Sequence, residues 1–314
     1  MEVINTITDI ERIEDGVITV GTFDGIHSAH LAIIQRVIDY AKKHGLKSSV
    51  ITFNPHPRQV IVKENGKPLE LLTTIDEKIT LLKSFSIDRL IVIPFTREFS
   101  RTPPENFITD VLCEKIGMKH LIIGYDHGFG KNRSGDIDFL RKYEKKCGFT
   151  LEVQGPISHS LGAISSTAIR TFLRKGEVDN AAKFLSRPYH LTGTVTHGDG
   201  RGKSIHYPTA NIQPYDEYKC IPANGVYVVG VKIGNDSYSG IMNVGVRPTF
   251  GNNTSTLEVH IFDFDRTIYG ADVMVEFLTR VRSEKKFDSA VMLKEQIDTD
   301  ASFAREYLAK IEKN

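Results

Sequence analysis

The spacing of apolar residues changes once along this 314-residue chain, and that change constrains the fold more than any other feature of the sequence. From about residue 17 to residue 155, short apolar runs alternate with segments of helical spacing, which predicts parallel strands joined by crossover helices. A sheet of that kind is covered by helices on both faces. The expected strands are VITV (17–20), SVITF (49–53), RLIVIPF (89–95), HLIIG (120–124) and LEVQ (151–154).

One crossover helix is expected between the first two of these strands. Its apolar positions recur at the spacing of a single helix face, and Gly45 provides the stop. These positions are Leu31, Ile34, Ile38 and Ala41.

After Arg187 and Pro188 the pattern becomes a series of strand signals separated by Gly, Asn and Asp, which predicts an antiparallel barrel or sandwich. The segment KIGNDSYSG (232–240) is expected to form a hairpin within it. We therefore expect two domains, 1–186 with an α/β fold and 187–314 with an antiparallel β fold. A C-terminal helix is expected from about residue 289, with apolar positions at Ala290, Leu293, Ile297, Phe303, Tyr307 and Ile311.

The composition is that of a globular protein, with 40% hydrophobic and 25% charged residues. A net charge of +1 provides no broad basic surface, so no nucleic-acid partner is expected. Cys113, Cys147 and Cys220 are far apart, which argues against a disulfide framework or a thiolate metal site and favours the reducing cytosol. The polar N-terminus and the lack of any run of about 18 apolar residues predict a cytoplasmic protein with no membrane partner.

The segment GTFDGIHSAH (21–30) follows the first expected strand and opens the first expected helix. Such a turn lies at the carboxyl end of a parallel sheet, where the free amides of a helix start attract anions. This position predicts a phosphate site that includes Gly21, Phe23 and Asp24. His27 and His30 are three residues apart, so both imidazoles can donate hydrogen bonds to a triphosphate. The segment has neither the GxGxxG nor the GK[ST] pattern of other nucleotide sites.

This pair of histidines also allows two alternative interpretations. Taken alone, paired histidines are more often structural or surface residues than catalytic ones. A zinc site would need three or four convergent ligands, and no matching His/Cys cluster accompanies the pair in the sequence.

A second phosphate-binding pattern, HGDGRGK (197–203), follows a strand-like run in the C-terminal half. Its glycines permit a loop that curls around phosphates, and its two basic residues add positive charge, although glycine-rich turns are also common hairpin connections. The expected ATP-binding residues are Gly198, Gly200, Arg201, Gly202 and Lys203.

Polar groups on two later strand segments complete this pattern. Thr209 and Asn211, in PTAN (208–211), project oxygens to one face of a strand, and hard oxygens suit Mg²⁺. Glu258 alternates with the apolar residues Leu257 and Val259, so the period alone describes an ordinary outward-facing strand residue.

The segment GTFDGIHSAH resembles the GxFDGxHxGH signature of the bacterial FAD synthases, a branch of the HxGH nucleotidyltransferases. Further matches follow in the order of that family at TFNPHP (52–57), GYDHGFG (124–130) and ISSTAIR (164–170). The resemblance implies a Rossmann-like domain in which the phosphate of FMN attacks the α-phosphorus of ATP, so that FAD forms and pyrophosphate leaves.

By this resemblance His27 and His30 contact the ATP phosphates, while Ser166, Thr167 and Arg170 hold the leaving pyrophosphate. An ordinary surface arginine is the alternative for Arg170. The flavin-binding residues implied are Asn54, Pro55, His56, Pro57 and Asp126, with a rigid turn as the alternative for the segment 54–57.

The loop at 197–203 and the PTAN segment resemble riboflavin kinase over roughly residues 187–314. That resemblance implies a β-barrel that binds ATP, holds Mg²⁺ at Thr209 and Asn211, and uses Glu258 as the base for the ribityl 5′-hydroxyl as it attacks the γ-phosphorus. Riboflavin, FMN and ATP are the expected substrates, with FMN and FAD as products. Further matches are NGVY (224–227), NVGVRPTF (243–250), LEVHI (257–261) and RSEKKF (282–287).

Three positions depart from the usual pattern of the two families. Ala29 stands in place of the glycine of HxGH, His127 in place of a more usual aromatic residue, and His206 in place of a glycine before PTAN. Two alternatives therefore stay open: an enzyme that keeps one of the two activities, and a flavin-sensing regulatory protein without turnover. Separating the products formed from riboflavin, ATP and Mg²⁺ distinguishes them. The oligomeric state is left open.

Overall fold

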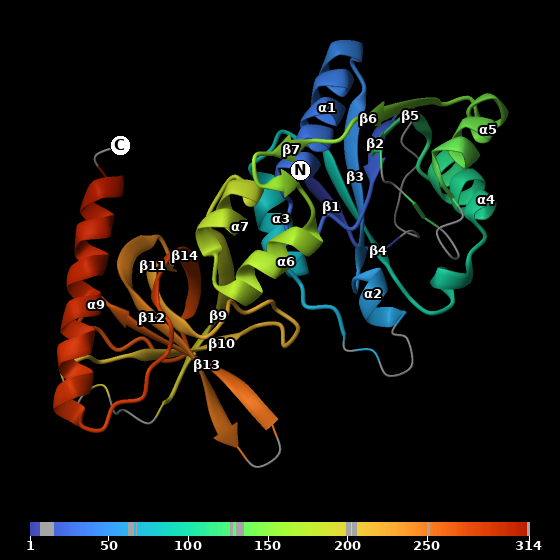
Figure 1. The fold of residues 1–314 in the computed structure, drawn as a ribbon. Helices are drawn as coiled ribbons and strands as arrows, with labels where there is room; N and C mark the ends of the chain where they lie inside the picture. The colour runs from blue at the N-terminus through green and yellow to red at the C-terminus, as the bar shows by residue number, and fades with distance from the viewer. Residues whose placement is uncertain are drawn as a thin grey trace. The chain divides into compact units, whose positions relative to one another are not determined.

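The structure is a computed structural model that describes residues 1–6, 16–61, 66, 68–125, 128–129, 135–198, 202, 206–249 and 252–312 (Figure 1). Contacts between residues divide the chain into two compact units, Met1–Ser165 and Ser166–Asn314. The helices α6 (Ser166–Lys175) and α7 (Val178–Leu185) belong to the second unit by this criterion. A functional boundary at residues 186 and 187 stays a prediction.

The first unit contains a six-stranded sheet in the order β1-β4-β3-β2-β5-β6, and every neighbouring pair is parallel. All five expected strands are present. The short β1, at one edge of the sheet, was not predicted, because three residues carry too little periodicity. The strands are β1 (Glu2–Ile4), β2 (Gly16–Val20), β3 (Lys47–Asn54), β4 (Arg89–Pro94), β5 (Met118–Gly124) and β6 (Thr150–Gln154).

Helices cover both faces of this sheet, as expected (Figure 1). On β2, Val17 packs with α1 while Ile18 belongs to the cluster on the opposite face. α1 and α3 lie on the first face, and η2 and α5 lie on the second. The bounds are α1 (Ser28–His44), α2 (Pro57–Val60), α3 (Ile75–Lys83), η1 (Phe99–Arg101), α4 (Pro104–Asn106), η2 (Phe107–Lys115, wound as a π-helix) and α5 (Ile137–Cys147). A small hairpin, β7 (Ser158–His159) and β8 (Gly162–Ala163), follows β6.

The crossover helix α1 ends where the sequence predicts, because Gly45 caps it with a left-handed φ of 67°. Ile34 and Ala41 are buried, while Leu31 and Ile38 are partly buried at the edge of the core. Of greater importance for function, β2 pairs with β3 on one side and β5 on the other. The carboxyl end of β2 is therefore the point where the strand order reverses, which is where ligands bind in sheets of this kind.

The second unit is built around a closed antiparallel barrel in the order β10-β13-β12-β11-β14-β9, closed by the pairing of β9 with β10. Of the two architectures expected, the barrel is therefore the one found. The predicted hairpin joins β11 to β12, with Gly234 at a φ of 59°. The strands are β9 (Tyr189–Thr196), β10 (Ala210–Pro214), β11 (Gly225–Ile233), β12 (Asp236–Thr249), β13 (Asn252–Ile261) and β14 (Asp272–Arg282).

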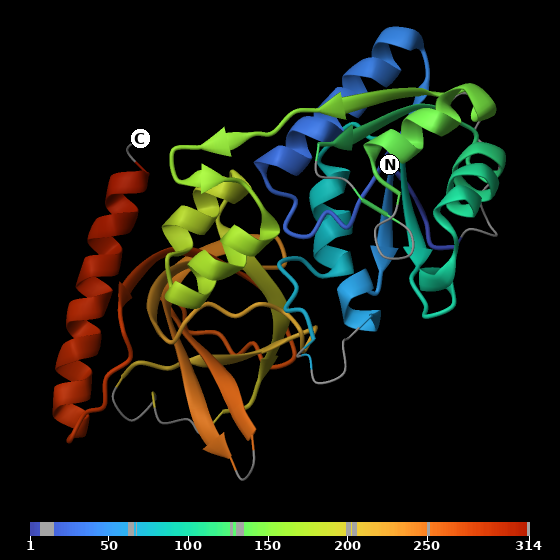
Figure 2. The ribbon, with the colours of Figure 1, turned by 45° about the vertical axis from the view of Figure 1, so that its right-hand side comes forward.

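The C-terminal helix α9 (Ala290–Ile311) lies along the outside of the barrel (Figure 2). The expected contact face is only partly right, because Phe303 and Ile311 are each 45% exposed. Four residues that meet the barrel follow an i, i+4, i+7, i+11 series, Ile297, Ala301, Ala304 and Leu308, and Tyr307, one of the expected positions, packs beside them.

A buried ion pair fastens α9 to the end of β14. Nε of Arg282 donates to both carboxylate oxygens of Asp300 at 3.0 Å, and a terminal guanidinium nitrogen donates to Oδ2 at 2.7 Å. Gln296 donates to the same carboxylate at 2.9 Å. The exposed fractions of the two charged side chains are 15% for Arg282 and 2% for Asp300, so each charge depends on the other.

We predict that Asp300→Ala lowers the free energy of unfolding of the second unit by about 3 kcal/mol, because it leaves the Arg282 guanidinium buried without its carboxylate. Urea denaturation followed by circular dichroism measures this change. The control is Lys294→Ala, which breaks an exposed i, i+4 pair with Asp298 and should cost less than about 1 kcal/mol. Equal effects of the two substitutions would contradict the assignment.

Candidate active sites

The segment between β2 and α1 is a compact loop in a backbone conformation that residues with side chains rarely adopt. Phe23 and Ile26 have φ angles of 45° and 41°, and Gly25 between them has a φ of 87°. Both apolar side chains are buried, with exposed fractions of 2% and 1%. Strain of this kind persists only where the surroundings enforce it, and it is often found at functional sites.

The carboxylate of Asp24 ties this loop to the segment that precedes α3. Its Oδ1 accepts hydrogen bonds from the amides of Leu72 at 2.9 Å and Thr73 at 3.1 Å, and the Gly25 amide donates to Oγ1 of Thr73 at 3.0 Å. These amides compensate for the burial of a carboxylate that is only 2% exposed. ATP binding by Gly21, Phe23 and Asp24 stays a prediction.

His27 and His30 lie face to face at the start of α1. Their ring centroids are 3.6 Å apart and their planes differ by 15°. His27 is the N-cap residue, and its Nδ1 accepts a hydrogen bond from the His30 amide at 3.4 Å. A neutral ring that accepts at Nδ1 carries its proton at Nε2, so Nε2 is the atom of His27 that can donate to an anion.

His30 is held in its neutral form by its surroundings. Burial lowers the pKa of His30 well below 6.5, and the neighbouring His27 and Lys78 lower it further. Among the described residues, the buried Nδ1 of His30 has no hydrogen-bond partner. An incoming phosphate would supply both an acceptor and the negative charge that this group lacks.

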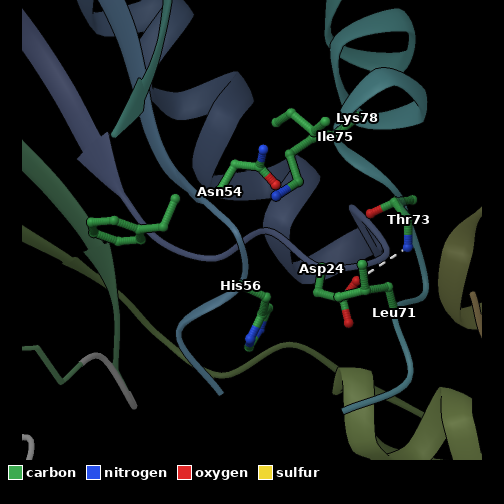
Figure 3. A pocket seen from close by; sticks show the side chains of 8 residues that line it. Asp24, Asn54, His56, Leu71, Thr73, Ile75 and Lys78 are labelled. Atoms are coloured by element: carbon green, nitrogen blue, oxygen red, sulfur yellow. Dashed lines mark hydrogen bonds between the residues drawn. The ribbon is translucent and has the colours of Figure 1, made fainter. Parts of the chain in front are cut away.

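A small pocket opens beside this loop (Figure 3). Asn54, the last residue of β3, and His56, just after that strand, form one side of it, and Figure 3 shows Asp24, Leu71 and Thr73 across from His56. The full lining is Asp24, Phe53, Asn54, His56, Leu71, Thr73, Ile75 and Lys78.

The segment 54–57 leads from β3 into α2, and the alternative of a rigid turn that the sequence suggested for it stays open. The peptide bond Asn54-Pro55 is cis, and Nδ1 of His56 accepts a hydrogen bond from the Arg58 amide at 3.1 Å. A turn and a pocket wall are therefore compatible here. Flavin binding by Asn54, Pro55, His56 and Pro57 stays a prediction, and Asp126 lies outside the described residues, as does His127.

Lys78 is a residue of this region that the sequence did not predict as part of a site. It is 5% exposed, and its Nζ donates to the Thr22 carbonyl at 2.6 Å and to Oγ1 of Thr52 at 3.0 Å. Burial lowers the pKa of Lys78 to about 8, although the charge of Asp24 acts in the opposite direction. One signal was available, because Lys78 falls on the same helical stripe as Ile75 and Leu82, where an apolar residue is expected.

Ser166, Thr167 and Arg170 lie in the first turns of α6. Arg170 is only 5% exposed, so the alternative of an ordinary surface arginine is wrong. A role for the three residues in holding pyrophosphate stays a prediction.

The register of the barrel brings the polar residues of the second pattern onto one face. Glu258 of β13 stands opposite Asn211 of β10 and opposite Asn243 of β12. Leu257 and Val259 are buried on either side of Glu258, so its side chain is directed away from the barrel interior. Glu258 is thus an outward-facing residue that shares its face with Asn211, because directly paired antiparallel residues lie on the same side of a sheet. Asn243 was not predicted as a site residue.

Two glycines of the phosphate-binding pattern lie against the PTAN segment. A Cβ at Gly198 would fall 2.0 Å from Nδ2 of Asn211, and a Cβ at Gly202 would fall 2.1 Å from the Tyr207 carbonyl oxygen and 3.4 Å from Oγ1 of Thr209. Only glycine permits so close an approach. Gly200, Arg201 and Lys203 lie outside the described residues.

This donor set fits a magnesium ion. Mg²⁺ prefers hard oxygen ligands, and three are present here: the Thr209 hydroxyl, the Asn211 amide oxygen and the nearby Glu258 carboxylate. Substrate phosphates are the usual remaining ligands. Among the described residues there is no group of three or more His, Cys, Asp or Glu side chains that could hold a metal by itself. His206, just before this segment, has a φ of 64°, in the left-handed region that favours the glycine expected here from the resemblance to riboflavin kinase.

Comparison with known proteins agrees with both resemblances, that of the first half to FAD synthases and that of the second half to riboflavin kinase. The family model described as FAD synthetase matches residues 9–168, and the one described as riboflavin kinase matches residues 185–308. Proteins named bifunctional riboflavin kinase/FMN adenylyltransferase are similar over nearly the whole chain. The relative from Bacillus subtilis is 33% identical over 301 residues, covering 95% of this chain and 94% of its own. The one from Haemophilus influenzae is 35% identical over 309 residues, covering 98% and 99%. The chain belongs to this bifunctional family.

A solved structure extends the likeness to three dimensions. A protein from Streptococcus pneumoniae described as a macrolide-efflux protein aligns with a TM-score of 0.87 and 33% identity, covering 96% of this chain and 98% of its own. The fold that this chain shares with that protein therefore includes both units. Across the part of the chain that the structure describes, no helix is long and apolar enough to span a membrane.

The lowered pKa of His30 predicts a pH dependence of stability. Because the folded-state pKa lies below 6.5, the unfolded chain takes up a proton first as the pH falls, and the free energy of unfolding decreases below about pH 6.5. One proton contributes at most about 1.4 kcal/mol per pH unit. Urea denaturation between about pH 5 and 7.5 should show a shallower decrease in His30→Gln than in the wild type. Parallel curves would mean that His30 titrates normally.

Proposed function

We propose that the chain converts riboflavin to FAD in two ATP-dependent steps, with riboflavin kinase activity in the barrel and FMN adenylyltransferase activity at the parallel sheet. One observation carries this proposal: two family matches follow each other on one chain, and each coincides with a cluster of groups suited to its reaction. The first cluster holds His27 and His30 at a helix start, and the second holds Asn211 and Glu258 on one barrel face.

In adenylyl transfer, a phosphate oxygen of FMN attacks the α-phosphorus of ATP, a P–O bond to the β-phosphate breaks, and pyrophosphate leaves. The chain's contribution is to hold charge and position the groups, since no covalent enzyme intermediate is required. Nε2–H of His27, the imidazole of His30 and the amides at the start of α1 would donate to the ATP phosphates. Ser166, Thr167 and Arg170 would hold the departing pyrophosphate.

In riboflavin phosphorylation, the ribityl 5′-hydroxyl attacks the γ-phosphorus of ATP, which gives FMN and ADP. Glu258 would accept the hydroxyl proton. Thr209 and Asn211 would hold Mg²⁺, which when bound offsets the negative charge of the phosphates. The loop at 197–203 would cover the nucleotide, with Gly198 and Gly202 allowing its close approach to the PTAN segment.

We also infer that the protein works in the cytoplasm. The wide spacing of Cys113, Cys147 and Cys220 in the sequence supports this inference, because it favours a reducing compartment. The substrates proposed here are the small molecules riboflavin, FMN and ATP.

The function is tested by incubating the purified protein with riboflavin, ATP and Mg²⁺ and separating the flavins. The wild type should form FMN and then FAD. His30→Ala should accumulate FMN, with FAD formation lowered about 10²-fold, because it removes a donor from the adenylyl-transfer cluster alone. Equal loss of both products in a folded variant would contradict the division of labour, and flavin binding without any product would favour the regulatory alternative.

The role of Glu258 is tested by Glu258→Gln, which keeps the shape and hydrogen-bonding capacity but cannot accept the proton. We expect kcat for riboflavin phosphorylation to fall about 10²–10⁴-fold with a smaller change in KM. FAD formation from supplied FMN should be unchanged. The matched control is Glu276→Gln on β14, a strand carboxylate that pairs with Lys232 at 2.9 Å. A kcat within a few-fold of wild type would remove Glu258 from the mechanism.

A further inference from the structure

A lysine ammonium is buried beneath the loop that carries the two histidines. Lys78 lies in the first turns of α3, and its side chain extends from the helix toward Asn54 and the pocket (Figure 3). The two contacts of Nζ are neutral oxygens, the Thr22 carbonyl at 2.6 Å and the Thr52 hydroxyl at 3.0 Å. Thr22 belongs to the loop after β2, and Thr52 lies near the end of β3.

Local hydrogen bonding does not account for a cation at this position. The Thr52 hydroxyl already donates to the Thr22 carbonyl at 3.2 Å, so both oxygens are paired without Lys78. Moving an ammonium group out of water is strongly unfavourable unless a charged partner compensates for it. A methionine would fill the same helical stripe without that penalty. The observation to be explained is therefore the positive charge of Lys78 at a buried position.

The carboxylates near Lys78 are engaged by backbone amides. Oδ1 of Asp24 accepts from the amides of Leu72 and Thr73, and Oε2 of Glu77 accepts from the Thr74 amide at 3.0 Å. Lys78 also acts on the histidine cluster, because its charge helps to lower the pKa of His30. The charge of Lys78 therefore interacts with both Asp24 and His30, two residues of this loop and of the helix that follows it.

We propose that Lys78 is a positioning residue for adenylyl transfer: its ammonium holds the Thr22 carbonyl, fixes the loop that presents His27 and His30, and provides buried positive charge behind the phosphates. The proposal rests on the adenylyltransferase function assigned to this unit. The negative charge of the substrate phosphates would add to that of Asp24, which alone does not offset the burial of the ammonium. Lys78 acts through the loop and needs no contact with the reacting atoms.

If Lys78 is a positioning residue, replacing it should lower the rate of FAD formation without lowering the stability of the fold. Lys78→Met should lower kcat for FAD formation from FMN and ATP roughly 10²-fold, a scale typical of misplaced reacting groups, with a smaller change in KM. The urea midpoint of the variant should equal or exceed that of the wild type, because the buried charge has been removed. A merely structural role would instead lower stability and activity together.

The experiment uses the full chain and measures both reactions on each variant. Riboflavin phosphorylation should be unchanged in Lys78→Met, and Lys83→Met, an exposed position on the same helix, should match the wild type in both reactions. If the wild type makes no FAD, the proposed function fails. If the wild type makes FAD and Lys78→Met is within about three-fold of it, the role of Lys78 alone is overturned.

If Lys78→Met does not fold, the pH dependence of kcat/KM for FAD formation tests the role of Lys78 instead. With a pKa of about 8, Lys78 loses its charge in the free protein above that pH, so kcat/KM for FAD formation in the wild type should decline there. Lys78→Gln, which keeps a donor but carries no charge, should lack this decline. Matching profiles for the two proteins would overturn the proposal. The other titratable groups around Lys78 are Asp24, His30, His56 and Glu77.

Discussion

The hydrogen bonds between the Asp24 carboxylate and the amides of Leu72 and Thr73 hold the first site together. A loop with positive φ at Phe23 and Ile26 would relax if it were free to move. Asp24 prevents this by joining the loop to the segment before α3, and the same junction brings Lys78 beneath the loop. Asp24 thus holds the loop that leads to His27 and His30 and also lines the pocket together with Lys78.

The two units present their reacting groups by different structural means. In the parallel sheet, the groups gather where the strand order reverses, and a helix start adds free amides. In the barrel, the interior is filled by apolar side chains such as Tyr227 and Phe277, and the polar groups occupy the outer face of neighbouring strands. Each architecture thus leaves a different surface available for chemistry.

Much of this could be predicted from the sequence. Four of the five long strands of the first unit, β2 to β5, contain a run that is buried on both faces, and such runs are visible without a structure, whereas the edge strand β6 is only partly buried. His27 and His30 were found because they follow the first strand directly. β1 was missed because it is short, and the packed face of α9 was misjudged at Phe303 and Ile311 because two overlapping apolar series occur on that helix.

Other features depend on contacts between distant segments, which periodicity does not encode. Lys78 contacts Thr22, which lies 56 positions away in the chain, so the burial of Lys78 depends on tertiary contacts. The pairing of Asn243 with Glu258 requires the register of β12 against β13, which is set by the whole barrel. Sequence matching identified Glu258 and Asn211 separately but could not show that they lie directly opposite each other.

The alignment of Asn211, Glu258 and Asn243 across three strands makes the register of the barrel part of the site. A slip of β13 by one residue would turn Glu258 into the apolar interior and bring Leu257 or Val259 to the outer face. Closure of the barrel opposes such a slip, because every strand has two partners and none has a free edge. The polar row is therefore preserved by residues that never approach the substrate, and substitutions at strand pairings far from Glu258 can remove the site without altering any of its side chains.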